Sequence, residues 1–266
     1  MSYKIYVIII TLFLFGRVIA QPNILKNGDL KATENKIMGN FTRSDSIGLN
    51  LLNWFKIGGN VEVFNSSSKS YLPTNSTTEA GIKIHTEKIK VAQQKLIPQT
   101  IIIGLIAGKP IVEPFVREYA IAEFHYKLLP NKQYRFSCQI YLDDIGWQGT
   151  THFGFKLENE MPNLRDLSPR YDFDAINIPI SKENNVWQQL DTIITTKGDE
   201  QFIRIGVFLP DNKVKLKWKN KQFKKEISKK YNIYEVGQYF LIANISFTAI
   251  DEQEWLLLNK SSTLKD

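Results

Sequence analysis

Residues 134–143 alternate strictly between two kinds of side chain, and this run constrains the fold more than any other part of the chain. One set consists of Tyr134, Phe136, Cys138, Ile140 and Leu142, and the other of Arg135, Ser137, Gln139, Tyr141 and Asp143. A period of two predicts a β-strand that packs the first set against a core and turns the second toward water or a partner. The Pro-Asn pair at 130–131 predicts a tight turn before it. A second strand within 115–129 then completes a hairpin.

Shorter runs that also predict strands recur along the chain, and the one at 101–107 is apolar throughout, as in a fully buried strand. They are residues 21–30, which contain an Asn-Gly turn, and residues 61–64, 81–85, 101–107, 151–157, 187–196, 201–209 and 239–249. Gly198 and Asp199 suit a hairpin turn between two of these runs. Residues 87–100 fit a short helix and an irregular connection equally well. Many short strands separated by turn residues predict an all-β protein with an antiparallel β-sandwich.

The first twenty residues have the features of a cleaved secretory signal peptide. Lys4 precedes an apolar run at 5–15, and Val18 and Ala20 occupy the −3 and −1 positions of the cleavage site. A retained membrane anchor needs about 18 apolar residues, and Arg17 interrupts this run too early. We therefore expect a secreted, periplasmic or cell-surface protein without a membrane span after cleavage.

No repeat or linker divides the rest of the chain, and its content of 43% hydrophobic residues is sufficient for a large core. We expect a signal peptide at 1–20, one β-sandwich domain at 21–250 with a lysine-rich insertion at about 211–232, and a tail at 251–266. The single cysteine, Cys138, lies in mid-strand and is predicted to be a buried hydrophobic residue. The core, and no disulfide framework, must hold such a fold together.

The sequence carries no motif that is typical of an enzyme. The three histidines, His85, His125 and His152, show no metal-ligand spacing, and no nucleophile elbow, phosphate loop or dinucleotide fingerprint occurs. Asp143 and Asp144 are adjacent, so on a strand they point to opposite faces and cannot act as a pair. We therefore expect a non-catalytic protein without a cofactor. A hydrolase or esterase built from dispersed carboxylates is a distant alternative.

Four separated features occur in the order and spacing of a known family. They are Asn-Gly-Asp-Leu at 27–30, Trp54 followed by a glycine pair, Arg-Glu-Tyr at 117–119 leading into 128–142, and 187–206 followed by a closing strand from Tyr239. Over residues 22–250 the chain resembles the galactose-binding-like jelly-roll domain of carbohydrate-binding modules. It is more closely similar to the secreted β-sandwich before the peptidoglycan-anchoring domain of some Bacteroidota outer-membrane proteins, although here the chain ends soon after the sandwich. The resemblance implies a jelly-roll sandwich that binds a carbohydrate.

Members of this family often hold a structural calcium ion near the early Asn-Gly turn and the final strand. The corresponding positions here hold Lys31 and Ala243-Asn244. Calcium prefers several oxygen ligands, particularly carboxylates, and lysine and alanine supply none. We therefore expect no metal at this place.

The predicted ligand-binding residues are Trp54, Arg117, Glu118, Tyr141, Trp147, His152 and Tyr171. An aromatic ring suits the C–H-rich face of a sugar, and strand ends and loops are where a jelly roll usually presents its ligand surface. Tyr141 belongs to the polar set of its strand, which favours exposure. Trp54 and Trp147 also fit a role in the core, and Arg117 with Glu118 also fits an ion pair or an edge hydrogen bond.

A lysine-rich segment within 211–230 holds nine lysines and two acidic residues, so it alone accounts for the net charge of +7. The predicted anionic-surface residues are Lys213, Lys215, Lys217, Trp218, Lys219 and Lys221. Lysines interleaved with a tryptophan can bind an acidic glycan, lipopolysaccharide or a membrane. They also fit a solvated edge strand, in which lysine prevents aggregation. Nucleic acid fits the charge but is a poor partner for an exported protein.

Taken together, these patterns predict an exported, non-catalytic module that binds a carbohydrate or another cell-envelope component. The alternative is a structural or adhesive envelope protein that docks through its lysine-rich segment. The expected partner is a glycan or envelope polymer, and not a nucleic acid.

Overall fold

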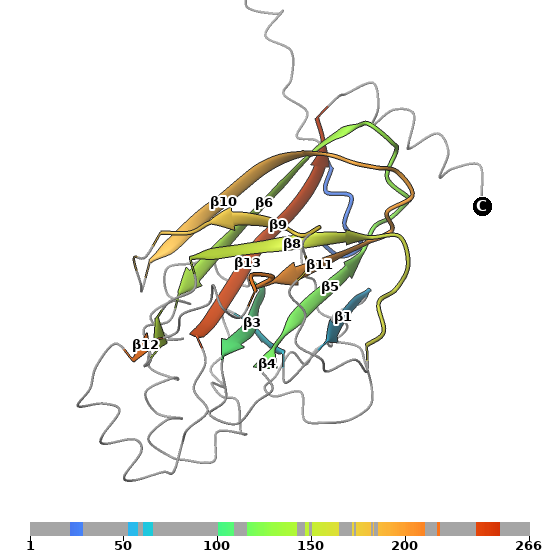
Figure 1. Ribbon diagram of the computed structural model, residues 1–266. Coiled ribbons are helices and arrows are strands. Elements are labelled where there is room, and N and C mark those ends of the chain that lie inside the picture. Colours follow the sequence, from blue (N-terminus) through green and yellow to red (C-terminus); the bar gives the residue numbers. More distant parts are fainter. Residues whose placement is uncertain are drawn as a thin grey trace, which may run out of the picture.

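A computed structural model of the chain describes a β-sandwich and its main connections (Figure 1). The described residues are 22–28, 53–57, 61–65, 101–108, 116–142, 147–148, 151–164, 172, 174–181, 183, 186–210, 217–218 and 238–250. The predictions for residues 1–20, 81–85, 87–100 and 251–266 fall outside this part and stay predictions.

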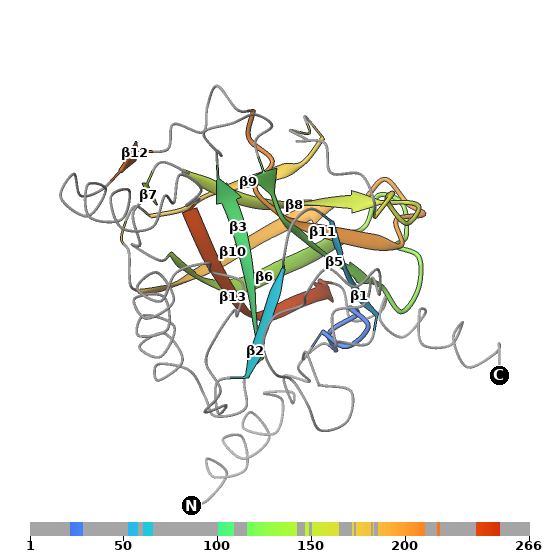
Figure 2. The ribbon, with the colours of Figure 1, turned by 90° about the horizontal axis from the view of Figure 1, so that it is seen from below.

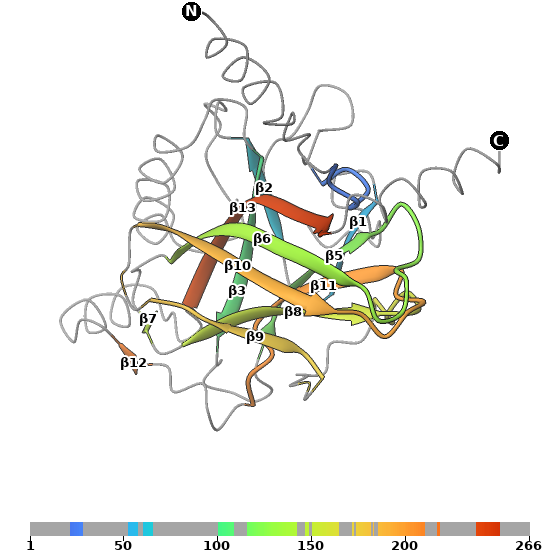
Figure 3. The same ribbon diagram turned by 90° about the horizontal axis from the view of Figure 1, so that it is seen from above.

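Two antiparallel sheets form the layers of the sandwich (Figures 1 and 3). The five-stranded sheet has the order β1 (Trp54–Ile57), β5 (Tyr119–Glu123), β11 (Phe202–Gly206), β8 (His152–Glu158) and β9 (Ile176–Pro179). The six-stranded sheet has the order β10 (Trp187–Thr195), β6 (Gln133–Leu142), β13 (Gln238–Ala249), β3 (Ile101–Gly108) and β2 (Glu62–Asn65), and β4 (Val116–Arg117) pairs with β3. The same succession can be followed in Figure 2. The predicted all-β antiparallel sandwich is confirmed.

The inward-facing side chains of both sheets form one core, and β6 supplies its central row. The buried residues of β6 include Tyr134, Phe136, Cys138, Ile140 and Leu142, as the alternation predicts. Phe136 packs on Phe155 of β8 with 4.3 Å between the ring centroids. Burial raises the pKa of the Cys138 thiol, so this cysteine stays neutral and unreactive, as predicted.

Two predicted hairpins are wrong. β5 lies between β1 and β11 in one sheet, whereas β6 lies between β10 and β13 in the other. β10 and β11 also belong to different sheets. Each connection is a corner that passes from one layer to the next. The error has a physical cause: strands joined by a corner and strands joined by a hairpin both alternate toward the same core, so periodicity does not distinguish them.

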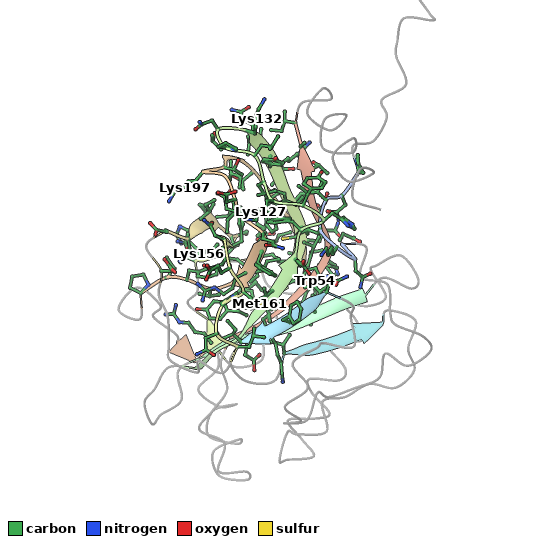
Figure 4. All side chains as sticks on the ribbon, turned by 90° about the vertical axis from the view of Figure 1, so that its right-hand side faces the viewer. Trp54, Lys127, Lys132, Lys156, Met161 and Lys197 are labelled. Carbon is green, nitrogen blue, oxygen red and sulfur yellow. The ribbon has the colours of Figure 1, made fainter. Side chains whose placement is uncertain are left out.

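The two corners lock together at one end of the sandwich. The N–H of Asn131 donates to the carbonyl oxygen of Thr196, and the N–H of Thr196 donates to that of Lys132, both at 2.9 Å. Asn131 has a φ of 58°, which is the left-handed geometry expected of the turn. Figure 4 shows Lys132 and Lys197 at this end. The corners therefore fix the relative position of the two sheets here.

A β-bulge interrupts the pairing of β13 with β6. The core-facing residues are Phe240 and Ile242 before the bulge and Ile245, Phe247 and Ala249 after it. Asn244 is the additional residue, and it is exposed with a φ of 51°. A bulge of this kind inserts one residue and re-aims its side chain. It therefore turns Asn244 outward while the rest of the strand keeps its apolar side chains in the core.

Candidate functional site

Three neighbouring strands, β10, β6 and β13, present a continuous set of side chains on the side away from the core, which we call the three-strand face. It comprises Trp187, Gln189, Asp191, Ile193 and Thr195 of β10, Gln133, Arg135, Ser137, Gln139 and Tyr141 of β6, and Asn244, Ser246 and Thr248 of β13. The register sets these side chains in rows across the strands. Ser137, for example, is opposite Asp191 on one side and Ser246 on the other. Amide and hydroxyl groups dominate the middle of the face.

Two aromatic rings close one end of the three-strand face. Trp187 is opposite Tyr141 in the strand register, and the ring centroids are 5.4 Å apart with the planes tilted by 51°. The Tyr141 side chain is buried, whereas Trp187 is half-buried. Tilted aromatic pairs at this spacing attract each other. Tyr141 therefore supports the ring of Trp187, and part of Trp187 remains open to solvent.

The next row of the face is built from side-chain amides. Gln139 is opposite Gln189 in the register, and Gln189 is exposed. The bulge brings Asn244 to the same row, where its Nδ2 donates to Oε1 of Gln139 at 2.6 Å. Asparagine tolerates left-handed backbone geometry better than most residues. Because an amide both donates and accepts hydrogen bonds, this row can bind several hydroxyl groups of one ligand.

The charged groups of the face neutralise each other. Nε of Arg135 donates to both carboxylate oxygens of Asp191, at 3.0 and 2.8 Å. The hydrogen bond and the negative charge of Asp191 raise the pKa of Arg135. The Arg135 side chain is 59% exposed, so solvent screens this pair and it contributes little to stability. The pair leaves the face polar but without net charge at its centre.

Two of the predicted ligand-binding rings are closed to solvent, which corrects their predicted role. Trp54 is 0% exposed, and its Nε1 donates to the carbonyl oxygen of Asn27 at 3.1 Å. It therefore belongs to the core, the alternative that its sequence position also fitted. Tyr141 is 1% exposed although it lies in the polar set of its strand. Its place beneath Trp187 gives it a supporting role, and the sequence interpretation missed Trp187 itself.

The other described residues predicted for the site lie apart from Tyr141. Arg117 and Glu118 are buried, and Nη1 of Arg117 donates to the carbonyl oxygen of Val207 at 3.0 Å. His152 begins β8 in the opposite sheet, where its Nδ1 is 2.8 Å from the hydroxyl of Thr151. The structure does not bring these residues together in one site. Tyr171 lies outside the described residues.

Trp147 meets the lysine-rich segment in a separate two-stranded ladder. β7 (Trp147–Gln148) pairs with β12 (Lys217–Trp218), and the register places Trp147 opposite Trp218. The ladder lies at the end of the sandwich where β10 begins (Figures 1 and 3). Two residues predicted for different sites are therefore neighbours. The remaining predicted lysines, Lys213, Lys215, Lys219 and Lys221, lie outside the part that the structure describes.

The outer face of the five-stranded sheet carries a network of ion pairs. Nη2 of Arg204 is 2.7 Å from Oε1 of Glu158 and 3.3 Å from Oδ2 of Asp172. Nζ of Lys156 is 2.5 Å from the same oxygen of Asp172. Cζ of Arg204 also lies 5.3 Å from the ring centroid of Tyr119, which is within the range of a cation–π contact. In Figure 4, Lys156 lies on the flank of the sandwich away from Trp54.

Glu158 and Asp172 both contact Nη2 of Arg204, but their charge state differs from that of the catalytic carboxylate pair of a hydrolase. A general acid needs a raised pKa. Partial burial acts to raise the pKa of Asp172, but hydrogen bonds from Lys156 and from the N–H of Asp174 oppose it. With the positive charges of Lys156 and Arg204, they hold the pKa of Asp172 below its ordinary value. Asp172 therefore stays ionised at neutral pH, and the network suits the attachment of its own segment to the sheet.

We expect the Asp172 network to weaken in acid. The pKa of Asp172 is lower in the folded protein than its ordinary value of 3.8. Its contribution to stability is therefore complete above that value and is lost as the pH falls through the folded pKa. The variant Asp172→Asn should lower the free energy of unfolding at pH 7 by up to about 1 kcal/mol and flatten its dependence on pH below about 4. Urea unfolding across the acid range measures both, and parallel curves for the two proteins would contradict the prediction.

Two further features of the described residues bear on ligands and location. They contain no group of three or more His, Cys, Asp or Glu side chains that could hold a metal ion. Within the same ranges, no helix has the length and apolar character required to cross a membrane. Of the positions that correspond to the family's calcium site, Ala243 is buried beside the bulge, and Lys31 is not among the described residues.

No protein-family model and no curated protein matches this chain. A similar solved structure is a xylan-binding domain from Paenibacillus barcinonensis, with 10% identity and a TM-score of 0.32 over 75% of this chain and 86% of that one. Another is a carbohydrate-binding module solved with β-1,4-galactotriose, with 10% identity and a TM-score of 0.34 over 86% and 99%. A third is the enzymatically active domain of tailspike protein 4 from bacteriophage CBA120, with 9% identity and a TM-score of 0.33. The similarity covers 75% of this chain and 20% of that one. The first two belong to the class that the sequence resembles.

Proposed function

We propose that this protein is an exported, non-catalytic module that binds a carbohydrate on its three-strand face. The observation that carries the proposal is the position of Trp187. This half-buried ring is supported by Tyr141 at the end of a row of amides. The proposal rests on this arrangement of side chains and not on the likeness to other folds.

An aromatic ring beside polar groups suits the two kinds of surface that a sugar presents. The C–H-rich face of a pyranose can pack on the open part of Trp187. Its hydroxyl groups can exchange hydrogen bonds with the amides of Gln139, Gln189 and Asn244, each of which both donates and accepts. Ser137 extends this row of polar groups along β6. A ligand that lies along the strands therefore meets the ring first and hydrogen-bonding groups after it.

Several side chains of the face are already held in place by their neighbours. The Asn244–Gln139 hydrogen bond and the Arg135–Asp191 pair fix four of them without a ligand. Preorganised groups lose less conformational entropy on binding. The bulge at Asn244 is part of the same arrangement, because bulges often re-aim a side chain beside a functional site.

The charge of the face favours a neutral ligand and binding without chemistry. Its described carboxylate, Asp191, is paired with Arg135, whereas a glycosidase needs two carboxyl groups that flank the scissile bond. Because Arg135 and Asp191 neutralise each other, the face also has little net attraction for an anionic sugar. We therefore propose a neutral oligosaccharide as the ligand. Export, inferred from the signal-like N-terminal segment, would place the protein where envelope and extracellular glycans occur.

The ring of Trp187 should account for much of the affinity. We expect Trp187→Ala to weaken binding of a neutral oligosaccharide at least about tenfold, because stacked aromatic anchors are the residues that dominate binding energy. Trp187→Phe keeps a ring and should retain part of the affinity. A glycan array identifies the sugar, and calorimetric titration then compares the variants.

Matched amide variants test whether binding occurs on this face. Gln189→Ala removes an exposed amide beside Trp187 and should weaken binding, whereas Asn163→Ala removes an exposed amide from the loop after β8 and should not. Equal affinity of the parent protein and Trp187→Ala for the same sugar would refute the proposed site. If the array gives no sugar while anionic vesicles bind, docking through the lysine-rich segment replaces the proposal.

A further inference from the structure

β10 is a long strand at the edge of its sheet. It has 9 residues, whereas β1, β2 and β9, the other strands that end the two sheets, have 4 each. Natural edge strands are usually kept short or carry lysine, proline or a bulge, which prevent pairing with another chain. β9 ends in Pro179 and fits this rule. The sequence of β10, WQQLDTIIT, contains no lysine or proline, and its one charged residue, Asp191, is paired with Arg135 of the neighbouring strand.

The hydrogen bonds of Thr196, directly after β10, show which backbone groups of this edge remain available. Its N–H donates to Lys132 and its carbonyl oxygen accepts from Asn131, so both of its groups point toward the β6 side. The backbone groups of successive strand residues point to opposite sides. The odd-numbered residues within 189–195 therefore direct their N–H and C=O groups away from β6, where no described strand pairs with them.

The middle of this edge carries an exposed apolar side chain. Ile193 is 57% exposed, and among the described residues the other large hydrophobic side chains open to solvent are Val186 and Ile250, at 37% and 39%. Single exposed apolar residues are common on protein surfaces. At Ile193, however, the apolar side chain coincides with outward-directed backbone groups. Such a position can form strand-to-strand hydrogen bonds and bury its side chain in the same contact.

We propose that a second copy of this chain pairs with β10 in antiparallel orientation, with Ile193 opposite the partner's Ile193. In this register the odd-numbered residue Ile193 exchanges both backbone hydrogen bonds with its counterpart. The two isoleucine side chains cover each other on one face of the joined sheet. The two-fold symmetry of this contact limits the assembly to a dimer.

The charges in and directly after β10 favour this register. Asp191 lies opposite the partner's Thr195. Lys197 lies two residues beyond the end of β10, where its N–H donates to Oε1 of Glu200 at 2.8 Å, and its side chain comes near the partner's Gln189. Lys197 is therefore diagonal to the partner's Asp191, within the reach of long side chains across a sheet. A register centred on Asp191 would instead place two carboxylates directly opposite each other, which is unfavourable. The occupant that best fits the edge is thus a second copy and not an unrelated strand.

Cysteine cross-linking tests the register of the full-length chain. Residues opposite each other in a hydrogen-bonded antiparallel pair have Cα atoms about 5.5 Å apart, which a disulfide spans. Ile193→Cys should therefore cross-link two copies under mild oxidation. Thr195→Cys should not, because the two residues 195 are offset by about 13 Å along the strands. The native Cys138 is buried and does not interfere. Cross-linking at 195 alone, or equally at both positions, overturns the register.

Sedimentation equilibrium tests the dimer itself. At about 0.1 mM the unmodified chain should have twice the mass of one copy. Ile193→Lys should raise the dissociation constant at least about tenfold, because it places two like charges at the centre of the contact. Val186→Lys is the matched control outside the paired span, and its dissociation constant should stay within about twofold of the parent. Far-UV circular dichroism spectra that match the parent show that both variants fold. A monomeric parent protein, or a fully dimeric Ile193→Lys, overturns the proposal. The test reads mass and cross-links, so its outcome is independent of carbohydrate binding.

Discussion

Replacing Arg204 with alanine is expected to lower the free energy of unfolding by about 3 kcal/mol or more. The Arg204 side chain is only 3% exposed and pairs with the carboxylates of Glu158 and Asp172. Removal of the guanidinium leaves Glu158, 17% exposed, without its closest cation. The rings of Tyr119 and Phe208 also lose a cation that lies 5.3 and 5.4 Å from their centroids. Urea unfolding at neutral pH measures the loss.

An exposed arginine provides the matched control for this prediction. Arg135 makes a comparable pair with Asp191, but its side chain is 59% exposed. Arg135→Ala should therefore lower the free energy of unfolding much less than Arg204→Ala does. Arg204→Met keeps much of the side-chain volume without the charge, so it separates packing from electrostatics and should recover only part of the stability. Equal losses for Arg204→Ala and Arg135→Ala would contradict the argument from burial.

The sequence predicted strands and their inward faces better than it predicted the outer faces. Alternation placed Phe136 and Ile140 correctly in the core, because every second side chain of a strand points to the same face of the sheet. The run FIRIG in β11 alternates in the same way, which suggests that Arg204 faces water. Segments far away in the sequence cover that face instead, among them the loop that carries Asp172. When a side chain is buried by segments that are distant in the sequence, the residues of its own strand do not reveal that burial.

Strand pairing was predicted less well than strand existence, for a similar reason. The connections at 124–132 and 196–201 have ordinary turn residues, yet both are corners between layers. β9 lies within a stretch, 158–179, that reads as a loop. A strand of 4 residues is too short to show its period clearly.

One feature of the candidate site could have been found from the sequence. In β10, Leu190 and Ile194 define the inward parity, and Trp187 falls on the outward one. In β13, the core-facing positions change from even to odd numbers around Asn244, but Leu241 and Ala243 are apolar as well, so the sequence itself does not show the bulge. Tyr141 could not have been assigned, because its burial depends on what packs around it and not on its own strand.

The core-facing residues of β13 change from even to odd numbers at Asn244, and this change places Phe247 in the core. The second large prediction concerns this residue. Phe247 is 0% exposed, and its ring centroid lies 4.9 Å from that of Phe124, 5.5 Å from that of Tyr134 and 6.5 Å from that of Phe155. Without the additional residue, Phe247 would point away from the core. We expect Phe247→Ala to lower the free energy of unfolding by about 3–5 kcal/mol, through lost burial and the cavity that remains. Urea unfolding provides the measurement.

Two further variants show whether the loss comes from the cavity between the sheets. Phe247→Leu retains most of the apolar volume and should cost clearly less than Phe247→Ala. Val186→Ala shortens a side chain that is 37% exposed and should change stability by less than about 0.5 kcal/mol. Since the bulge both aims Phe247 inward and turns Asn244 outward, deletion of Asn244 should destabilise the core at least as much as Phe247→Ala does. A deletion variant as stable as the parent chain would mean that the strand can slip by one residue, and the three-strand face would then lose the backbone feature that positions its central amide.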